Sequence, residues 1–103
     1  MGTNQVAVLD IPYKVFPNPF YNRLHVQLAI PSTINWKTVI VEIYNATGQK
    51  IRIYNNGELI YNGFLNIEWD GRNNAGTSLG AGVYYMVIRN DQFKKDIKLV
   101  KLQ

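Results

Sequence analysis

The sequence contains no cysteine and only one histidine, His25. Without cysteine, disulfide bonds, zinc–thiolate sites and thiol nucleophiles are excluded. Serine is scarce too, because Ser32 and Ser78 are the only two and both fall in predicted loops. The carboxylates are scattered and form no recognisable motif, so no nucleophile, base or carboxylate pair is set up for catalysis. We therefore predict a protein that is not an enzyme and needs no cofactor.

Long hydrophobic runs are also absent. No apolar stretch approaches the about 20 residues that a membrane-spanning helix needs, so no membrane insertion is predicted. Residues 1–10 lack the basic segment followed by an apolar stretch that marks a signal peptide. Met1 and Gly2 instead suggest the start of a piece excised from a longer protein.

Charged residues make up 17% of the chain, and the formal net charge is +4. Most basic residues are isolated, and the one cluster lies near the end of the chain: Lys94, Lys95, Lys98 and Lys101. Lysine on an edge strand discourages pairing with other chains. We expect this protective role for the cluster, and we predict no nucleic-acid partner.

Short segments of alternating polarity run through the chain. In residues 23–30, Leu24, Val26, Leu28 and Ile30 share one face, whereas Arg23, His25 and Gln27 share the other. His25 is therefore expected to be solvated. Further strands are predicted at 5–11, 38–44, 50–54, 58–61, 64–69, 83–88 and 93–102, separated by turns such as Asn45–Gly48, Asn56-Gly57 and Asn62-Gly63. This spacing predicts an all-β fold, an immunoglobulin-like antiparallel β-sandwich of about seven strands.

A polar, glycine-rich loop is predicted at residues 70–82. Its beginning superficially resembles a calcium loop, but an EF-hand needs an oxygen ligand at the third position and Glu at the twelfth. Arg72 and Ala81 occupy those positions. We predict no metal site here, and expect Asp70 to accept hydrogen bonds from nearby backbone N–H groups.

Exposed aromatic residues could form a platform for a sugar ring, as they do in many β-sandwiches. The candidates lie in or near loops: Trp36, Tyr54 and Tyr61, with Tyr21 beside them. The alternative for Trp36 is that it covers one end of the core. Carbohydrate binding therefore stays open as a second hypothesis.

Several stretches together form an ordered motif set. They are Val15–Phe20 (VFPNPF), Val41–Ile51 (VEIYNATGQKI), Trp69–Gly76 (WDGRNNAG), Leu79–Tyr85 (LGAGVYY) and Lys98–Leu102 (KLVKL). In this order and spacing they resemble the type A C-terminal sorting domain of the type IX secretion system. The resemblance covers residues 15–103. Residues 1–14 would then be the start of the excised piece, with an extra first strand or the tail of a passenger domain.

Each motif residue also has an expected structural role. Proline fixes φ, so Pro17 and Pro19 are expected to make a stiff lead-in to the sandwich. Gly48 is expected to supply a turn, and Gly82 a tight start to the strand that follows. The Tyr84 ring is expected to pack while its hydroxyl finds a backbone partner. Of the remaining residues, Lys98 and Lys101 are expected to face outward, toward a receptor.

The resemblance implies a folded secretion signal. It places the domain behind an N-terminal passenger in a larger exported protein of Bacteroidetes-type bacteria. Its partners would be the outer-membrane type IX translocon and a sortase, and its route would run through the periplasm to the cell surface or medium. The implied recognition residues are Pro17, Asn18, Pro19, Gly48, Gly82, Tyr84, Lys98 and Lys101.

The stretch Trp69–Arg72 also resembles the Ig-like domain of flagellar hook-capping proteins, which is a related sandwich with a role in assembly. Two alternatives to the sorting signal therefore remain. One is a carbohydrate-binding module, and the other is a structural Ig-like module of an extracellular bacterial protein. Fold similarity alone does not decide among these functions.

Overall fold

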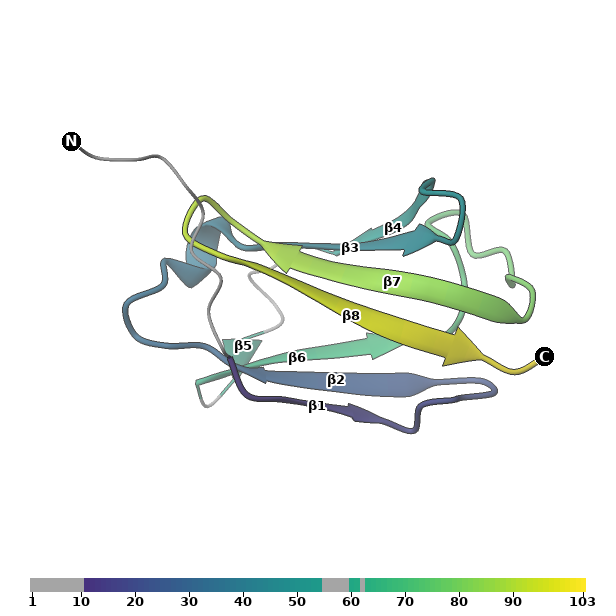
Figure 1. The fold of residues 1–103 in the computed structure, drawn as a ribbon, viewed down its shortest axis with the longest axis horizontal. Coiled ribbons are helices and arrows are strands. Elements are labelled where there is room, and N and C mark those ends of the chain that lie inside the picture. Colours follow the sequence, from purple (N-terminus) through teal and green to yellow (C-terminus); the bar gives the residue numbers. More distant parts are fainter. Residues whose placement is uncertain (1–10, 55–59, 62) are drawn as a thin grey trace.

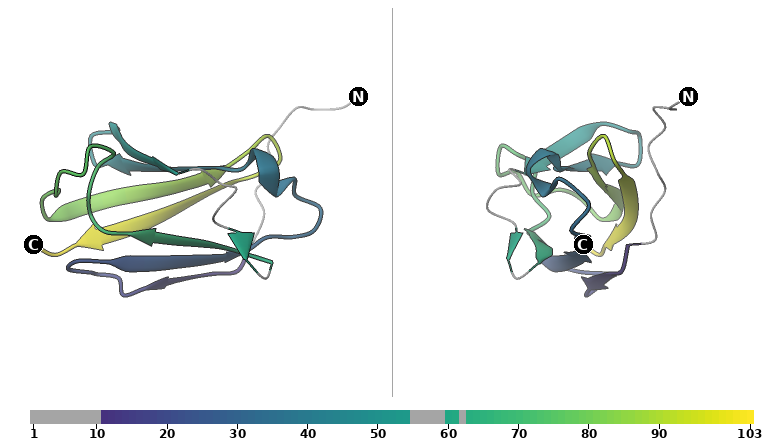
Figure 2. Two further views of the ribbon diagram at one scale, coloured as in Figure 1. Left: turned by 180° about the vertical axis from the view of Figure 1, so that it is seen from behind. Right: turned by 90° about the vertical axis from the view of Figure 1, so that its left-hand side faces the viewer.

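The computed structural model describes residues 11–54, 60–61 and 63–103. Two four-stranded sheets face each other, as Figure 1 and the end-on view in Figure 2 show. The strands are β1 (Tyr13–Phe16), β2 (Leu24–Ala29), β3 (Ile40–Asn45), β4 (Lys50–Tyr54), β5 (Ile60–Tyr61), β6 (Phe64–Trp69), β7 (Gly82–Arg89) and β8 (Lys94–Lys101). A short 3₁₀ helix, η1 (Trp36–Thr38), precedes β3. The predicted immunoglobulin-like antiparallel β-sandwich is confirmed.

The first sheet has the order β1-β2-β6-β5. Strands β2 and β6 pair antiparallel, with Leu24 opposite Trp69 and Val26 opposite Ile67. These four side chains are buried because alternation along each strand sends every second residue toward the other sheet. The inward and outward faces predicted for residues 23–30 and the strand predicted at 64–69 are confirmed.

The second sheet has the order β4-β3-β7-β8. The central strand β7 pairs with β3 on one side and with β8 on the other. Its residues Met86 and Ile88 are fully buried, and Ile43 of β3 and Leu99 of β8 pack into the same core. The strand predicted at 83–88 is confirmed, and it lies inside the sheet between β3 and β8.

Three aromatic rings close one end of the core. The ring centroid of Trp69 lies 5.5 Å from that of Phe20 and 5.1 Å from that of Tyr84, the second pair meeting edge to face. Trp69 also donates a hydrogen bond from Nε1 to the carbonyl of Arg72, at 2.9 Å. The indole is therefore anchored to the loop that leaves β6, and it fixes the end of the sandwich from which the C-terminus emerges.

Strand β1 is absent from the predicted strands, and it lies between Pro12 and Pro17. The structure places a four-residue strand between them, paired only with β2. An edge strand tolerates flanking prolines, since one side of its backbone needs no ladder partner. Of the strand predicted at 5–11, only Ile11 lies within the described residues, where it is buried. The predicted turn Asn56-Gly57 lies outside them.

Within the ranges described, no helix is long and apolar enough to cross a membrane. The same residues contain no group of three or more histidines and carboxylates arranged to hold a metal ion.

Candidate recognition site

The residues of the motif set gather at the end of the sandwich that carries the C-terminus (Figure 1). Pro17–Pro19 lie in the connection between β1 and β2, and Gly48 lies in the turn between β3 and β4. Gly82 begins β7 and is paired with Lys101, the last residue of β8. We call this end of the molecule the motif end.

The segment Asn18–Phe20 docks on the open edge of β8. The Asn18 side chain donates from Nδ2 to the carbonyl of Lys98 at 3.1 Å and accepts from the backbone N–H of Val100 at 2.9 Å. The backbone N–H of Phe20 then donates to the Val100 carbonyl at 2.9 Å, and the Leu102 N–H donates to the Phe20 carbonyl. A chain that begins in the first sheet thus completes the edge of the second. The expected role of Pro17 and Pro19 as a lead-in before the sandwich is therefore wrong, because they lie between its first two strands.

Tyr84 is held inside the motif end. Its hydroxyl donates to the carbonyl of Gly80 at 2.7 Å, and its side chain is almost fully buried. Burial raises the pKa of the phenol, because the charged form would lose its hydration. The expected backbone partner for this hydroxyl is confirmed. Because the ring is buried and its hydroxyl is bonded inside the domain, Tyr84 stabilises the fold.

The β3–β4 turn forms the upper corner of the motif end. Gly48 has φ of +89°, and its N–H donates to the Asn45 carbonyl at 3.0 Å. The Asn45 side-chain oxygen accepts from the backbone N–H groups of Thr47 and Gln49. The predicted turn role of Gly48 is confirmed. Between this turn and the start of β7 lies a shallow hollow of about 240 Å³, lined by Asn45, Ala46, Thr47, Ala81, Gly82, Val83 and Tyr84.

The two lysines of β8 differ in orientation. Lys98 is exposed, as expected, but Lys101 is only 5% exposed, so the expectation that it faces outward is wrong. Alternation along β8 puts Lys101 on the inner face with Ile97 and Leu99. The same alternation could have shown this from the sequence. The long stem of lysine can be buried while its ammonium group reaches a polar opening.

Of the aromatic residues considered for sugar binding, Trp36 and Tyr54 lie in separate elements, η1 and β4. Trp36 lies in η1, and it is partly buried against the core, which agrees with a covering role. Tyr54 ends β4, where its hydroxyl donates to the Glu68 carbonyl at 3.1 Å and the Arg52 guanidinium lies 4.9 Å from its ring centroid. The backbone of Tyr61 belongs to β5, but its side chain lies outside what the structure describes.

The loop that follows β6 is organised by Asp70. This carboxylate accepts from the backbone N–H of Arg72 at 3.1 Å and pairs with the Arg52 guanidinium at 3.3 Å. Gly71 and Gly76 both have positive φ. The expected turn is confirmed, and its carboxylate is used internally.

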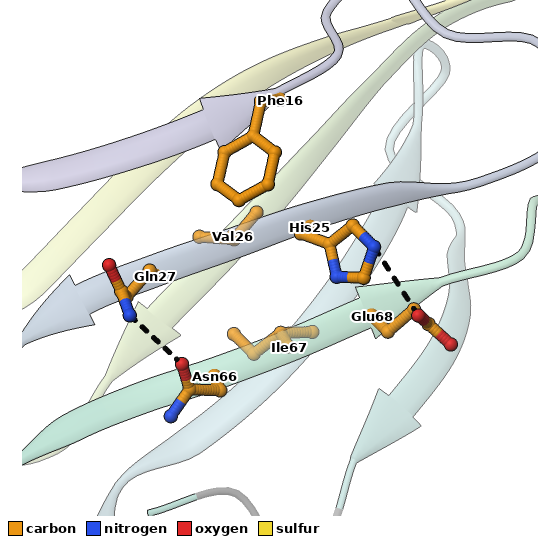
Figure 3. A pocket seen from close by; sticks show the side chains of 7 residues that line it. All are labelled: Phe16, His25, Val26, Gln27, Asn66, Ile67 and Glu68. Atoms are coloured by element: carbon orange, nitrogen blue, oxygen red, sulfur yellow. Dashed lines mark hydrogen bonds and ion pairs between the residues drawn. The ribbon is translucent and has the colours of Figure 1, made fainter. Parts of the chain in front are cut away.

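An unpredicted pocket lies on the outer face of the first sheet (Figure 3). The rings of Phe16 and His25 stack with their centroids 5.5 Å apart, and His25 Nε2 lies 3.4 Å from a carboxylate oxygen of Glu68. Gln27 donates to Asn66 on the neighbouring strand β6, at 3.3 Å. His25 is half exposed, as its outward position predicted. Alternation could place these side chains outward but could not show which strands bring them together.

This fold, two facing antiparallel sheets without a disulfide, defines an immunoglobulin-like domain. The family model of the FlgD Ig-like domain matches residues 22–92, and the chain belongs to this family. The resemblance to hook-capping Ig-like domains noted in the sequence is therefore confirmed. No curated protein matches the chain.

Two solved structures from Porphyromonas gingivalis are similar in fold. PorZ, described as an essential bacterial surface component of the type-IX secretion system, superposes with a TM-score of 0.59 at 18% identity, over 88% of this chain and 11% of PorZ. Dimeric latent PorU superposes with a TM-score of 0.57 at 22% identity, over 87% of this chain and 9% of PorU. The chain thus spans about one tenth of each of these proteins, and the likeness is one of fold.

Proposed function

We propose that this domain is a non-catalytic sorting signal, which directs a larger exported protein through the type IX secretion system to the cell surface or medium. The observation that carries the proposal is the convergence of the motif residues. Asn18, Gly48, Gly82 and Lys98 are far apart in the sequence, yet all belong to elements that meet at the motif end. A receptor could therefore recognise this end of the folded domain as one continuous surface.

The similarity in fold to PorZ and PorU supports the same proposal, because PorZ is a surface component of that system. The proposed partners are the outer-membrane translocon and a sortase, with a passenger domain ahead of this one. The exposed groups available for contact include Lys98, the segment Pro17–Pro19 and Gly48, together with the hollow beside the β3–β4 turn. Tyr84 and Lys101 would support that surface from within.

The test is secretion of a reporter fused ahead of the domain and given a periplasmic signal peptide. A host with a working type IX system is compared with the same host lacking its translocon. We expect the reporter outside the cell only in the first host. A folded fusion that stays periplasmic in both hosts would contradict the proposal.

A matched pair of variants locates the recognition surface. Ala46 is exposed and lines the hollow, so Ala46→Arg should block contact there while leaving the core intact. Ser32 is exposed in the loop before η1, so Ser32→Arg is the control. We expect secretion to fall at least about tenfold for A46R and to be unchanged for S32R. Equal secretion of both variants would contradict a recognition surface at this hollow of the motif end.

Membership of the FlgD Ig-like family favours a second candidate, a structural module in an extracellular assembly. Such a module would self-associate or bind its neighbours in the assembly. Sedimentation of the domain alone, and of the domain fused to a passenger, distinguishes the structural module from the sorting signal. A monomer that is secreted only by the type IX system supports the sorting signal.

A further inference from the structure

A second opening lies at the motif end, between the β1–β2 connection and the loop after β6. It is a polar hollow of about 290 Å³. Three basic side chains from separate parts of the chain line it: Arg23, Arg72 and Lys101. Tyr21, Asn22 and Ser78 add hydroxyl and amide groups, and Gln103 lies at the margin.

Lys101 is the unusual member of this group. Its side chain is 5% exposed, and among the described residues it makes no hydrogen bond or ion pair. Among the described residues, every fully enclosed side-chain nitrogen or oxygen has a hydrogen-bond partner. The Lys101 ammonium has none, so it is not fully enclosed and opens into the hollow that it lines. An ammonium group that opens into a hollow and has no carboxylate partner there is available to an anion.

Asp70 is the one acidic side chain that lines the hollow, and its ion pairs are with arginines and not with Lys101. Asp70 accepts hydrogen bonds from the guanidinium of Arg52, at 3.3 Å, and from the backbone N–H of Arg72. Arg52 does not line the hollow, so it balances the Asp70 charge from outside. The two arginines that do line it are at least half exposed, and each has a partner: Arg23 lies 3.7 Å from Glu68, and Arg72 lies 4.0 Å from Asp70 and donates to the Gly76 carbonyl at 2.8 Å. Because both side chains are exposed, they can turn from these contacts toward a ligand.

We propose that this hollow is an oxyanion-binding site that takes a phosphate group, with Lys101 as its fixed cation. Arginine offers forked donors that match tetrahedral oxyanions, and lysine adds a point charge. Three basic side chains line the hollow against the single acidic side chain of Asp70, and this excess suits a dianion better than a single carboxylate. The site is inferred from these side chains alone and does not depend on the secretion role.

Inorganic phosphate is the probe. The isolated chain is titrated at constant ionic strength while backbone amide shifts are followed by NMR. We expect saturable shifts at Gly71, Arg72 and Lys101. Acetate should bind more weakly, and acetate binding as tightly as phosphate would contradict a site built for a dianion.

Lys101→Met keeps the buried stem but removes the charge, and should weaken phosphate binding about tenfold or more. Lys98→Met, on the opposite face of the same strand, is the control and should leave it unchanged. Arg23→Gln removes an exposed charge without touching the core, so it tests the site even if K101M unfolds. Unsaturable shifts in the parent chain, or equal loss in K98M, would overturn the proposal.

Discussion

The side-chain oxygen of Asn18 accepts the backbone N–H of Val100 at 2.9 Å, across 82 positions of sequence. The amide of the same side chain donates to the Lys98 carbonyl at 3.1 Å. One carboxamide thus takes the place of a peptide group of a neighbouring strand and satisfies the edge of β8 where a ladder partner would otherwise be needed.

Asn18→Ala removes both hydrogen bonds and should lower the free energy of unfolding by about 1–2 kcal/mol. Because the edge of β8 opens, amide exchange of Val100 should become faster than in the parent. Urea unfolding and hydrogen exchange followed by NMR measure the two effects. Asn22→Ala is the control, since Asn22 is exposed in the same connection. Equal destabilisation by both substitutions would show that Asn18 has no special role at this edge.

Glu42 is a buried carboxylate on β3 held by three donors. Lys50 Nζ lies 2.8 Å away, Arg89 lies at 3.2 Å, and the Tyr44 hydroxyl donates at 3.1 Å. Burial by itself raises the pKa of Glu42, but the hydrogen bonds from Lys50 and Tyr44 and the charge of Arg89 outweigh it, so the pKa lies below its ordinary value of 4.5. The carboxylate therefore stabilises the folded state.

A lowered folded-state pKa means that this stabilisation is complete above pH 4.5 and is lost as the pH falls through the folded-state value. Glu42→Gln should lower the free energy of unfolding at neutral pH by about 1–3 kcal/mol. The gap between parent and variant should then shrink on acidification. In Lys50→Met the free energy of unfolding should depend less steeply on pH than in the parent. Urea unfolding from pH 7 to 3 measures this, and parallel pH curves for E42Q and the parent would refute the assignment.

Tyr84 and Tyr85 form a matched pair on β7. The Tyr84 hydroxyl is bonded to the Gly80 carbonyl inside the domain, whereas Tyr85 points outward and is 40% exposed. Tyr84→Phe should cost about 1 kcal/mol, because it leaves a carbonyl without its donor, and Tyr85→Phe should cost almost nothing. Secretion of a Y84F fusion should match the parent at temperatures where the domain stays folded. A secretion defect in folded Y84F would mean that a receptor reads this hydroxyl directly.

The parts of the fold that the sequence predicted are those with two-residue periodicity. In β2, β6 and β7 the apolar residues alternate, since one face of each strand meets the other sheet, and the buried positions follow directly. Strand β1 gives no such signal. Only Val15 is even partly buried there, so its four residues show no alternation between prolines.

The motif end depends on contacts that no local pattern contains. The docking of Asn18–Phe20 on β8 joins segments about eighty positions apart, and prolines nearby favoured a stiff lead-in instead. Lys101 is different, because the periodicity of Ile97 and Leu99 already placed it inward. Its charge favoured an outward position, but a lysine stem can be buried at the open end of a sandwich.

Alanine substitutions at Gly71 and Gly76 distinguish the effect of backbone strain from the effect of crowding beside Lys101. Both have positive φ, at +74° and +83°, but a Cβ on Gly71 would lie 2.6 Å from Cε of Lys101, whereas a Cβ on Gly76 would meet nothing within 4 Å. Alanine at either position should cost about 1 kcal/mol for the left-handed conformation. Only Gly71→Ala should also push the Lys101 side chain aside, since the end of a lysine side chain can move.

The additional loss of stability in Gly71→Ala should therefore be small, about 1 kcal/mol or less. The ¹³Cε and ¹Hε signals of Lys101 should shift in G71A and stay in place in G76A, and phosphate binding should weaken in G71A alone. Urea unfolding and side-chain NMR on the two variants measure these effects. Unchanged Lys101 signals and phosphate binding in G71A would mean that Gly71 does not position the lysine, and its glycine would then be needed for the turn alone.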